Sequence, residues 1–367
     1  IFTINYVKWN LCENDTRERI VNMKIIFFVI SIFIYYVSCE KNKDIKKPLV
    51  VVDVDAGADD AIALLMLLAA HKRQEIELKA ITCVAGNTNL TNVATNVLRL
   101  LEAASALNIP VYKGANEGLV PNPDYDLSQQ EWHGKDGFGD LDYGEQQPPD
   151  LNQIKPQHAV NAIYSIISNS PKQVTVIFLG PLTNAALISK IYPDFFELVK
   201  DIFVMGGNYK GVGNKSNAAE FNFGMDPEAA YLIFRDTNKN ITLLPWETCM
   251  EMSLTTDWRF NVMGNIENPE MKLMNAVEKS IYMLHNNDTS YLACDAAGVA
   301  VMLDPKVITK SFTTHATVEL CGRFTRGQTV IDHNNLHIPN VKIVTQMDED
   351  KFKKMLLVAA GHSCAEL

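Results

Sequence analysis

Three features are missing from this 367-residue chain, and each absence argues against a class of protein. There is no Cys-x-x-Cys pair, which argues against a zinc-thiolate site or a dithiol redox motif. Positive charge is scarce, with 33 Lys and Arg against 43 Asp and Glu, and the net charge of −10 argues against phosphate-driven nucleic-acid binding. No linker or internal repeat divides the chain, so we expect one domain. Hydrophobic residues make up 47%, which provides a sizeable core and excludes a disordered polar protein.

The N-terminal stretch carries a targeting pattern. Met23-Lys24 precedes a 13-residue apolar run at positions 25–37, with small residues near its end. This arrangement is typical of a secretory signal peptide, and the run is short against the ~20 residues of a membrane span. We therefore expect residues 1–22 to be non-native upstream sequence, residues 23–39 a signal peptide, and residues 40–367 a secreted domain with no membrane attachment after cleavage. An uncleaved N-terminal anchor is the alternative.

From Pro48 onward, short β-branched runs alternate with longer amphipathic runs. This alternation predicts a single α/β domain whose central sheet is mostly parallel, Rossmann-like and flanked by helices. The expected strands are residues 49–56, 78–86, 109–112, 173–180, 201–207 and 241–245, with β-like stretches near 312–321 and 341–345. The expected helices are residues 59–72, 91–107, 158–168, 182–191, 227–235, 268–285, 295–303 and 350–360. Residues 113–157 are too long for a plain connection and predict functional loops.

Polar and flexible residues gather where the expected strands end. Asp53 and Asp55 end the first strand, Gly86-Asn87 the second, Gly180 the fourth and Gly206-Gly207 the fifth. In parallel α/β sheets the ligand crevice lies beyond the carboxyl ends of the strands. We therefore expect the active site at this edge of the sheet.

The strongest local signal is the segment Asp53-Val-Asp55-Ala-Gly57-Ala-Asp59-Asp60. Four carboxylates in so short a segment repel one another unless a cation or protons neutralise them. Oxygen ligands without Cys or His indicate a hard ion, Ca²⁺ or Mg²⁺. With Mg²⁺, the segment would suit a phosphohydrolase of the haloacid dehalogenase type, and this alternative stays open. Helix capping by one Asp explains one carboxylate, not four.

Six blocks follow one another along the chain: VVDVDAGADDA, ITCVAGNTNLTNVATNVLRLLE, HGKDGFGD, FLGPLTNAAL, VMGGNYKGVGNKSNAAEFNFGMDPEAA and CDAAGVAVMLDP. In this order they resemble the nucleoside hydrolases, the inosine–uridine-preferring and purine-preferring N-ribohydrolases, over roughly residues 48–350. The resemblance implies calcium-dependent hydrolysis of the N-glycosidic bond of a small-molecule ribonucleoside, giving ribose and a free base. It also implies a homo-oligomer, commonly a dimer or tetramer.

The same resemblance implies roles for individual residues. Ca²⁺ would be held by the carboxylates of Asp55, Asp60 and Asp295 and by the backbone carbonyl of Leu179, with Asp53 as a supporting carboxylate. Asp55 would also take the proton of the attacking water. This water would attack a sugar carbon that has oxocarbenium character. The ribose would be held by Asp59, at its 2′-hydroxyl, and by Asn87, Asn214, Glu220 and Asn222. Asn214 also begins a glycosylation sequon, so a plain loop role is its alternative.

The base end of the expected site departs from the family pattern. Some members carry His and others Trp before the third calcium-binding Asp, whereas this chain has Cys294. Cys294 is therefore either a base contact or a small buried apolar residue. Trp132 and His133, in EWHGKDGFGD, could cover the base, although a lone Trp more often packs. This departure keeps open a nucleoside-binding protein of the same fold with impaired catalysis.

Overall fold

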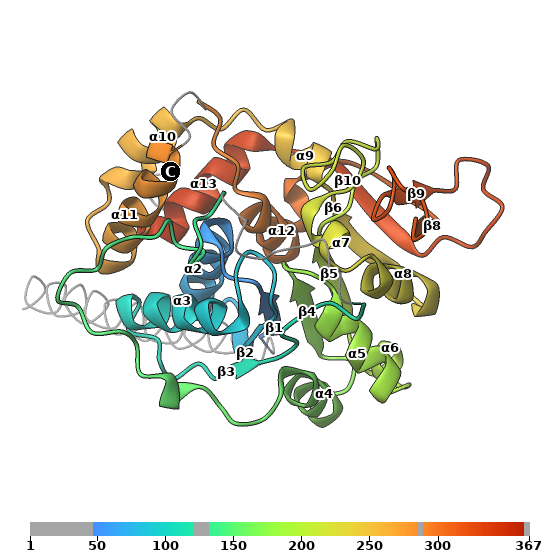
Figure 1. Cartoon of the computed structure of the whole chain (residues 1–367), viewed down its shortest axis with the longest axis horizontal. Helices are drawn as coiled ribbons and strands as arrows, with labels where there is room; N and C mark the ends of the chain where they lie inside the picture. The colour runs from blue at the N-terminus through green and yellow to red at the C-terminus, as the bar shows by residue number, and fades with distance from the viewer. Residues whose placement is uncertain (1–46, 121–131, 285–288, 363–367) are drawn as a thin grey trace, which may run out of the picture. The chain divides into compact units, whose positions relative to one another are not determined.

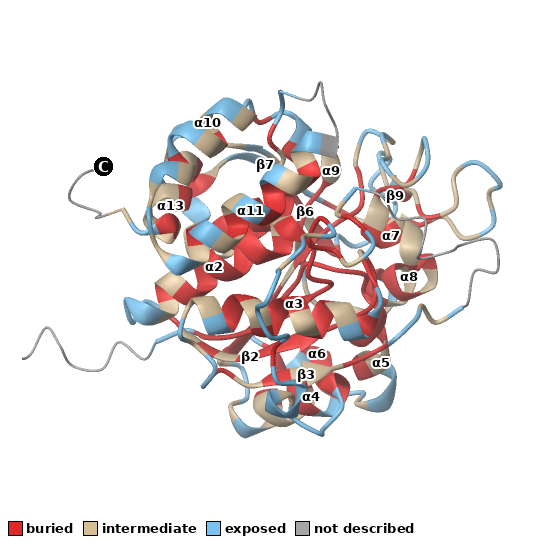
Figure 2. Cartoon of the chain, turned by 60° about the vertical axis from the view of Figure 1, so that its left-hand side comes forward, coloured by how far each residue is buried: buried red, intermediate tan, exposed pale blue. Residues whose placement is uncertain are grey.

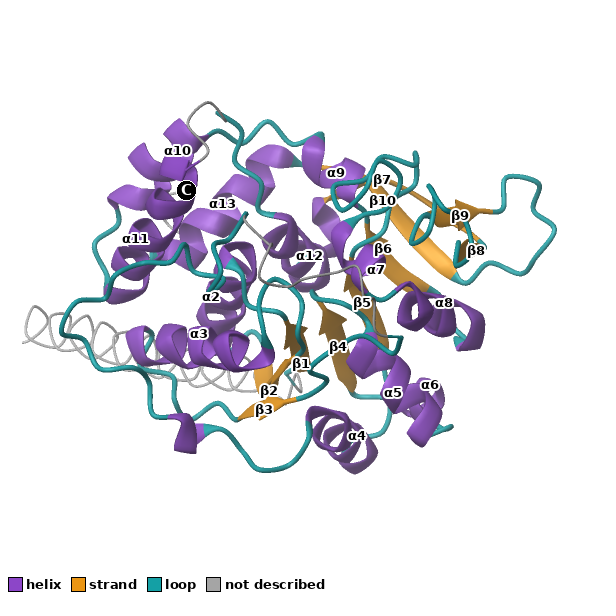
Figure 3. Cartoon of the chain, viewed as in Figure 1, coloured by secondary structure: helices purple, strands orange, loops and turns teal. Residues whose placement is uncertain are grey.

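An eight-stranded sheet runs through the computed structural model, which describes residues 47–120, 132–284 and 289–362. Its order is β3-β2-β1-β4-β5-β6-β10-β7, and every neighbouring pair is parallel except β10 and β7 (Figure 3). The strands are β1 Leu49–Val54, β2 Glu77–Cys83, β3 Val111–Lys113, β4 Val174–Phe178, β5 Asp201–Met205, β6 Ile241–Leu244, β7 Ile308–Thr314 and β10 Val341–Met347. A separate antiparallel pair consists of β8 Ala316–Val318 and β9 Thr329–Ile331. The predicted mostly parallel sheet is confirmed.

Helices cover both faces of the sheet (Figure 1). They are α2 Ala58–Lys72, α3 Leu90–Ala103, α4 Ala159–Asn169, α5 Thr183–Ile191, α6 Phe195–Leu198, α7 Phe221–Met225, α8 Pro227–Asp236, α9 Trp246–Met250, α10 Thr256–Asn261, α11 Pro269–Leu284, α12 Cys294–Leu303 and α13 Glu349–Ala360. Helices α2, α3, α11, α12 and α13 share one core with the sheet, and α4, α5, α6 and α8 share the other. Helix α2, red over most of its length in Figure 2, lies at the centre of the first layer against α11, α12 and α13.

Strand β1 shows why the sequence folds this way. All six of its residues are buried. Val50, Val52 and Val54 enter one core, while Leu49 and Val51 enter the other, as the two-residue period of a strand requires. A strand covered on both faces is continuously apolar rather than alternating, which is the pattern that the sequence shows here.

The order of the strands reverses at β1. The chain leaves β1 through α2 to β2 on one side, and later returns through α4 to β4 on the other side. The connections therefore diverge between the carboxyl ends of β1 and β4, where α/β proteins bind their ligands. Asp55 follows β1 and Leu179 follows β4, so the fold brings these two predicted site residues to the same crevice.

Some elements differ from their predicted form. The short helices α6, α7, α9 and α10 were not predicted, because four to six residues contain too little of the helical period to be recognised. The β-like stretch near 312–321 is two strands, since β7 ends at Thr314 in the main sheet and β8 begins at Ala316 in the separate pair. Beyond β3, the described part of the loop region 113–157 contains only the 3₁₀ turn Leu151–Gln153 as regular structure.

The described residues from Pro48 onward form one compact unit. The predicted upstream segment 1–22 and signal peptide 23–39 lie outside the described residues, and the domain start at residue 40 stays a prediction. Within the part of the chain that the structure describes, no helix is long and apolar enough to cross a membrane.

Candidate active site

The acidic segment forms the turn that joins β1 to α2. Ala56 has a positive φ of 21°, and Gly57 is the N-cap of α2. The Asp60 Oδ2 atom accepts a hydrogen bond from the Gly57 backbone N–H at 2.9 Å, which caps the first turn of the helix. Capping thus accounts for Asp60 alone, and the neighbouring carboxylates need another explanation.

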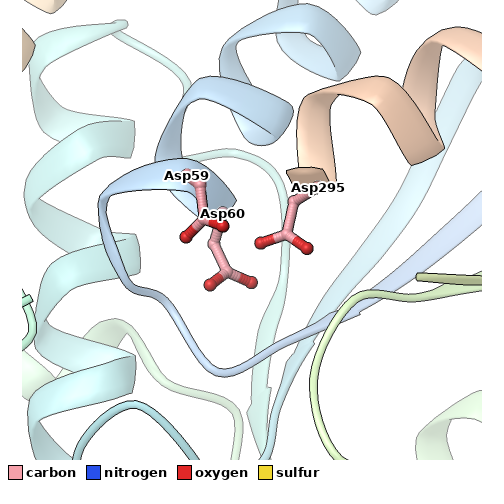
Figure 4. Close-up of side chains that lie close together, drawn as sticks. All are labelled: Asp59, Asp60 and Asp295. Atoms are coloured by element: carbon pink, nitrogen blue, oxygen red, sulfur yellow. The ribbon is translucent and has the colours of Figure 1, made fainter. Parts of the chain in front are cut away.

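Three carboxylates from two helices share one small space (Figure 4). One oxygen from each of Asp59, Asp60 and Asp295 lies within 4.8 Å of the other two. Asp59 and Asp60 come from the first turn of α2, and Asp295 comes from the first turn of α12. Asp55 joins the cluster from the end of β1, because its carboxyl is in hydrogen-bonding contact with that of Asp60. The structure therefore brings Asp55, Asp59 and Asp60 together with Asp295, although Asp295 is remote in the sequence.

Asp55 fits tightly between the segments that follow β2 and β4. Its Oδ2 accepts a hydrogen bond from the Asn87 backbone N–H at 2.8 Å. A Cβ atom on Gly86 would lie 2.1 Å from that oxygen, and one on Gly180 would lie 2.9 Å from Oδ1. Glycine at these two positions is therefore needed for the carboxylate to reach the crevice.

The electrostatics of the cluster favour a bound cation. Burial, followed by repulsion from the neighbouring carboxylates, raises the pKa of Asp60 to about 7 and the pKa values of Asp55 and Asp295 well above their ordinary range. Asp60 Oδ1 and Asp59 Oδ1 are buried without a hydrogen-bond partner among the described residues. A cation coordinated by the Asp60 oxygen would satisfy it and allow the neighbouring carboxylates to ionise together, while the Asp59 oxygen stays open to a hydrogen-bond donor. The donor set consists of oxygen only, which fits a hard metal ion.

Asp53 lies behind the cluster and does not line the cleft. It is fully buried, and its Oδ1 accepts hydrogen bonds from the Thr82 hydroxyl and, at 2.9 Å, from the Asn184 amide. Burial raises the pKa of Asp53 to about 6, while these two donors oppose the rise. Its contacts join β1 to β2 and α5, and its supporting role at the metal stays a prediction.

A cleft of about 390 Å³ opens above the carboxylates, within the range expected for small-molecule sites. It is lined by the predicted residues Asp55, Asp59, Asn87, Trp132, His133, Leu179, Asn214, Glu220, Asn222, Cys294 and Asp295. Asp60 lies beneath this lining and is fully buried. A larger hollow of about 720 Å³ lies elsewhere, beside Pro48 and α13, and contains none of these residues.

Glu220 and Asn222 are held by the first turn of α7. The Glu220 carboxylate is its N-cap and accepts backbone N–H bonds from Gly207 at 2.7 Å, Asn222 at 2.9 Å and Phe223 at 3.1 Å. Burial raises the pKa of Glu220 to about 7 against these three donors. The Asn222 amide donates to the Leu179 carbonyl at 2.6 Å, which leaves that carbonyl a second lone pair.

Asn87 and Asn214 line the cleft from two loops. The Asn87 amide donates to Asp60 Oδ2 at 3.3 Å, so it bridges the end of β2 and the first turn of α2. Asn214 is exposed, and its backbone N–H donates to the Ala219 carbonyl at 3.2 Å. Asn214 is thus at once accessible and part of the cleft.

Residues 50–354 match the family model described as "Inosine-uridine preferring nucleoside hydrolase". The chain belongs to this family. The inosine-uridine preferring nucleoside hydrolase of Crithidia fasciculata is 30% identical over 316 residues, which cover 84% of this chain and 96% of that protein. The pyrimidine-specific ribonucleoside hydrolase of Klebsiella pneumoniae is 31% identical over 319 residues, which cover 84% and 96%. The solved structure of an inosine-guanosine nucleoside hydrolase matches with a TM-score of 0.78 at 28% identity, covering 86% of this chain and 99% of that one.

Family membership makes the chain a ribonucleoside N-glycosyl hydrolase with a small-molecule nucleoside as its substrate. It gives no support to the magnesium phosphohydrolase that the acidic segment alone left open. The α/β fold agrees with the solved nucleoside hydrolases.

Trp132 and His133 occupy different parts of the cleft of this nucleoside hydrolase. Trp132 is 38% exposed and packs edge-on against Tyr282, with ring centroids 6.2 Å apart. His133 is more buried, with 14% of its side chain exposed, and its Nε2 lies 3.5 Å from Asp59 Oδ1. Only Trp132 thus has the exposed aromatic surface that the prediction of a cover for the base requires.

Cys294 lines the cleft of the hydrolase at its apolar end and is 4% exposed. Contact with Cys249, followed by burial, raises the pKa of the Cys294 thiol well above its ordinary range. Both thiols are free, as are the other described cysteines Cys83 and Cys321. Cys294 is therefore a small buried residue that also faces the cleft, so a base contact stays a prediction.

The remaining cleft residues of the hydrolase were not predicted from the sequence. Met205, Phe221, Trp246 and Leu292 also line the cleft. They are apolar residues at the ends of strands or beside helix starts, where an apolar residue usually belongs to the core. Trp246 begins α9 directly after β6 and Pro245.

Proposed function

We propose that this chain is a secreted, calcium-dependent ribonucleoside hydrolase that splits the N-glycosidic bond into ribose and a free base. The observation that carries the proposal is the meeting of Asp55, Asp60 and Asp295 at one cleft. These residues come from the end of β1, the start of α2 and the start of α12. Buried carboxylates that repel one another need a compensating positive charge, which a bound cation would supply.

Calcium would be held by the carboxylates of Asp55, Asp60 and Asp295 and by the Leu179 carbonyl, with Asp59 beside them. Ca²⁺ accepts 6–8 oxygens, so this set leaves positions for a water and for sugar hydroxyls. When bound, the ion supplies the positive charge that keeps the carboxylates ionised and makes a nearby water more acidic.

Asp55 is the residue that we propose as the general base. The Asn87 N–H fixes one of its oxygens, while the side chain as a whole faces the cleft. It accepts the proton of the water that attacks the anomeric carbon as the bond to the base breaks. Gly86 and Gly180 lie directly against the carboxylate and restrict its movement, so it is oriented before substrate arrives.

The ribose would be bound by the polar half of the cleft. We assign the 2′-hydroxyl to Asp59 and the other sugar contacts to Asn87, Asn214, Glu220 and Asn222. Glu220 and Asn222 are buried and held by hydrogen bonds to the backbone. Because the Asn222 amide N–H groups donate to the Leu179 and Met205 carbonyls, both side chains would act on the sugar as rigid acceptors. Hydroxyl contacts that tighten as the sugar acquires positive charge lower the barrier for hydrolysis.

The base would lie among Trp132, Phe221, Trp246 and Cys294. The thiol of Cys294 is a poor proton donor at neutral pH, because its contacts raise its pKa. The second candidate is a nucleoside-binding protein of the same fold with impaired catalysis, in which Cys294 supplies no acid at the base end. The relatives include proteins named for inosine and uridine and for pyrimidines, so we propose a ribonucleoside substrate without restricting the base.

Export and assembly belong to the same proposal. The pattern at residues 23–39 supports secretion, and the resemblance to the family supports a homodimer or homotetramer. Light scattering of the purified chain, beginning at residue 40, measures the assembly directly.

Removal of the divalent ion is expected to abolish base release. The carboxylates would take up protons without the ion, and the cleft would lose both its charge and its sugar ligand. Base release from inosine, adenosine and uridine should be measured after chelation, and again after Ca²⁺ or Mg²⁺ is added back. Recovery with Ca²⁺ supports the hydrolase, whereas tight nucleoside binding in Ca²⁺ without any base release supports the binding protein. Undiminished turnover in the presence of chelator contradicts both the metal and the mechanism.

A further inference from the structure

We propose that His133 is a positioning residue that acts on the ribose 2′-hydroxyl through Asp59, and not on the base. The proposal rests on the proposed function, because it concerns how the same site holds the sugar. It changes the expectation from the sequence, in which His133 and Trp132 together cover the base.

The hydrogen bonds of the ring define which nitrogen carries its proton. The Ala58 backbone N–H donates to His133 Nδ1 at 3.3 Å. A backbone N–H can only donate, so Nδ1 is the unprotonated acceptor and the neutral ring carries its proton on Nε2. Nε2 lies 3.5 Å from Asp59 Oδ1, a buried oxygen without a hydrogen-bond partner among the described residues. The ring nitrogen that carries the proton therefore lies beside the carboxylate that is assigned to the sugar.

The loop that carries His133 is anchored to the β1–α2 turn. The ring lies against Gly57, where a Cβ atom would come within 3.1 Å of two ring carbons. The His133 carbonyl accepts the Gly139 N–H at 2.7 Å. The Asn96 amide bonds both the Asp136 carbonyl of this loop, at 2.8 Å, and the Ala56 carbonyl of the turn, at 3.1 Å. The ring is thus held at the carboxylate side of the cleft, and it cannot move to contact bases of different size.

The two ring nitrogens contact consecutive residues, Ala58 and Asp59, in the first turn of α2. The ring therefore sets the orientation of the Asp59 carboxylate relative to that turn. Catalytic contacts are often long before substrate binds, so we expect the 3.5 Å separation to shorten to a hydrogen bond with ribose in place. Loss of the contact should weaken every ribonucleoside equally, because all of them present the same 2′-hydroxyl.

Two substitutions separate the two ring contacts. His133→Gln places an amide N–H near the position of Nε2 and keeps the donor to Asp59. His133→Asn places its amide near Nδ1, so it keeps the partner of Ala58 and loses the donor. We expect His133→Asn to lower kcat/KM for inosine, adenosine and uridine alike by about 10–100-fold, and His133→Gln to restore most of that loss.

Removing the 2′-hydroxyl from the substrate is the change that matches these substitutions in the protein. The preference for inosine over 2′-deoxyinosine should narrow in His133→Asn by about the factor lost in kcat/KM, and should stay near the wild-type preference in His133→Gln. A loss confined to one class of base, or an unchanged preference for inosine over 2′-deoxyinosine in His133→Asn, overturns the proposal.

A binding measurement separates this proposal from the proposed function. An iminoribitol and its 2-deoxy analogue mimic the sugar and need no turnover. In Ca²⁺, calorimetry should show that His133→Asn loses affinity for the iminoribitol but not for the 2-deoxy analogue. A wild-type chain that binds the iminoribitol and releases no base contradicts the hydrolase, and the binding difference then decides the role of His133. Equal loss for both compounds indicates a merely structural role and overturns the proposal.

Discussion

Asp55→Asn is expected to lower kcat for nucleoside hydrolysis about 10³-fold at saturating Ca²⁺, because an amide cannot take the proton of the attacking water. The substitution preserves the size of the side chain, which the tight surroundings require. The amide oxygen can also keep the hydrogen bond from the Asn87 N–H, which measures 2.8 Å to the carboxylate. The loss should therefore report on proton transfer rather than on a disturbed fold.

Asp226→Asn is the matched control for this experiment. Asp226 is also a buried carboxyl with a raised pKa, caused by burial, but it is the N-cap of α8 and does not line the cleft. It accepts hydrogen bonds from the Thr183 hydroxyl at 2.6 Å and from the Ala229 N–H at 3.0 Å. Its amide variant should keep kcat within a few-fold of wild type and lose only stability. If Asp55→Asn retains more than about a tenth of the wild-type kcat, Asp55 is not the general base.

Arg259→Met is expected to lower the free energy of unfolding by about 3–5 kcal/mol. Arg259 is fully buried and pairs with Glu278, which is 2% exposed. The guanidinium also donates to Asn275 at 2.8 Å, and the Tyr291 hydroxyl donates to Glu278 at 2.9 Å. Methionine would leave the Glu278 carboxylate buried without its counter-charge, which costs far more than a surface pair.

The double variant Arg259→Met, Glu278→Gln supplies the control. It removes both charges and keeps an oxygen that accepts from Tyr291, so it should recover much of the stability lost in Arg259→Met. Urea unfolding in the presence of Ca²⁺ measures both variants. A double variant less stable than the single one would show that the ion pair is not the source of the effect. The network matters to the site because Tyr291 closely precedes Asp295, and α11, which carries Glu278, packs against α2.

Most strands of the sheet could be predicted from the sequence, because strands of a buried parallel sheet appear there as continuous runs of β-branched residues. The polar residues at the ends of β1, β2 and β4 then predicted which edge of the sheet carries the active site, and the positions of the helices were not needed. Asp295 is different. Nothing local marks a lone Asp in an apolar helix as a metal ligand, and it was assigned only through the resemblance of the CDAAGVA block to the family.

The sequence could not provide the contacts made across the fold. The proximity of His133 to Asp59 depends on a loop that folds back onto the β1–α2 turn, and a sequence pattern contains no information on that approach. The same holds for Met205 and Leu292, whose apolar side chains line the cleft although their types predict core packing. The buried Arg259–Glu278 pair was likewise invisible, since charged residues at those positions predict an exposed helix face.

Calcium titration of the chelator-treated chain, compared with its Asp295→Asn variant, tests the central claim most directly. The account predicts one Ca²⁺ per wild-type chain, and an affinity at least about 100-fold weaker when Asp295 loses its charge, because the ligands from α2 and α12 act together on one ion. Equal Ca²⁺ affinity in the two proteins, or no Ca²⁺ binding by the wild type, would contradict a shared metal site at this cleft.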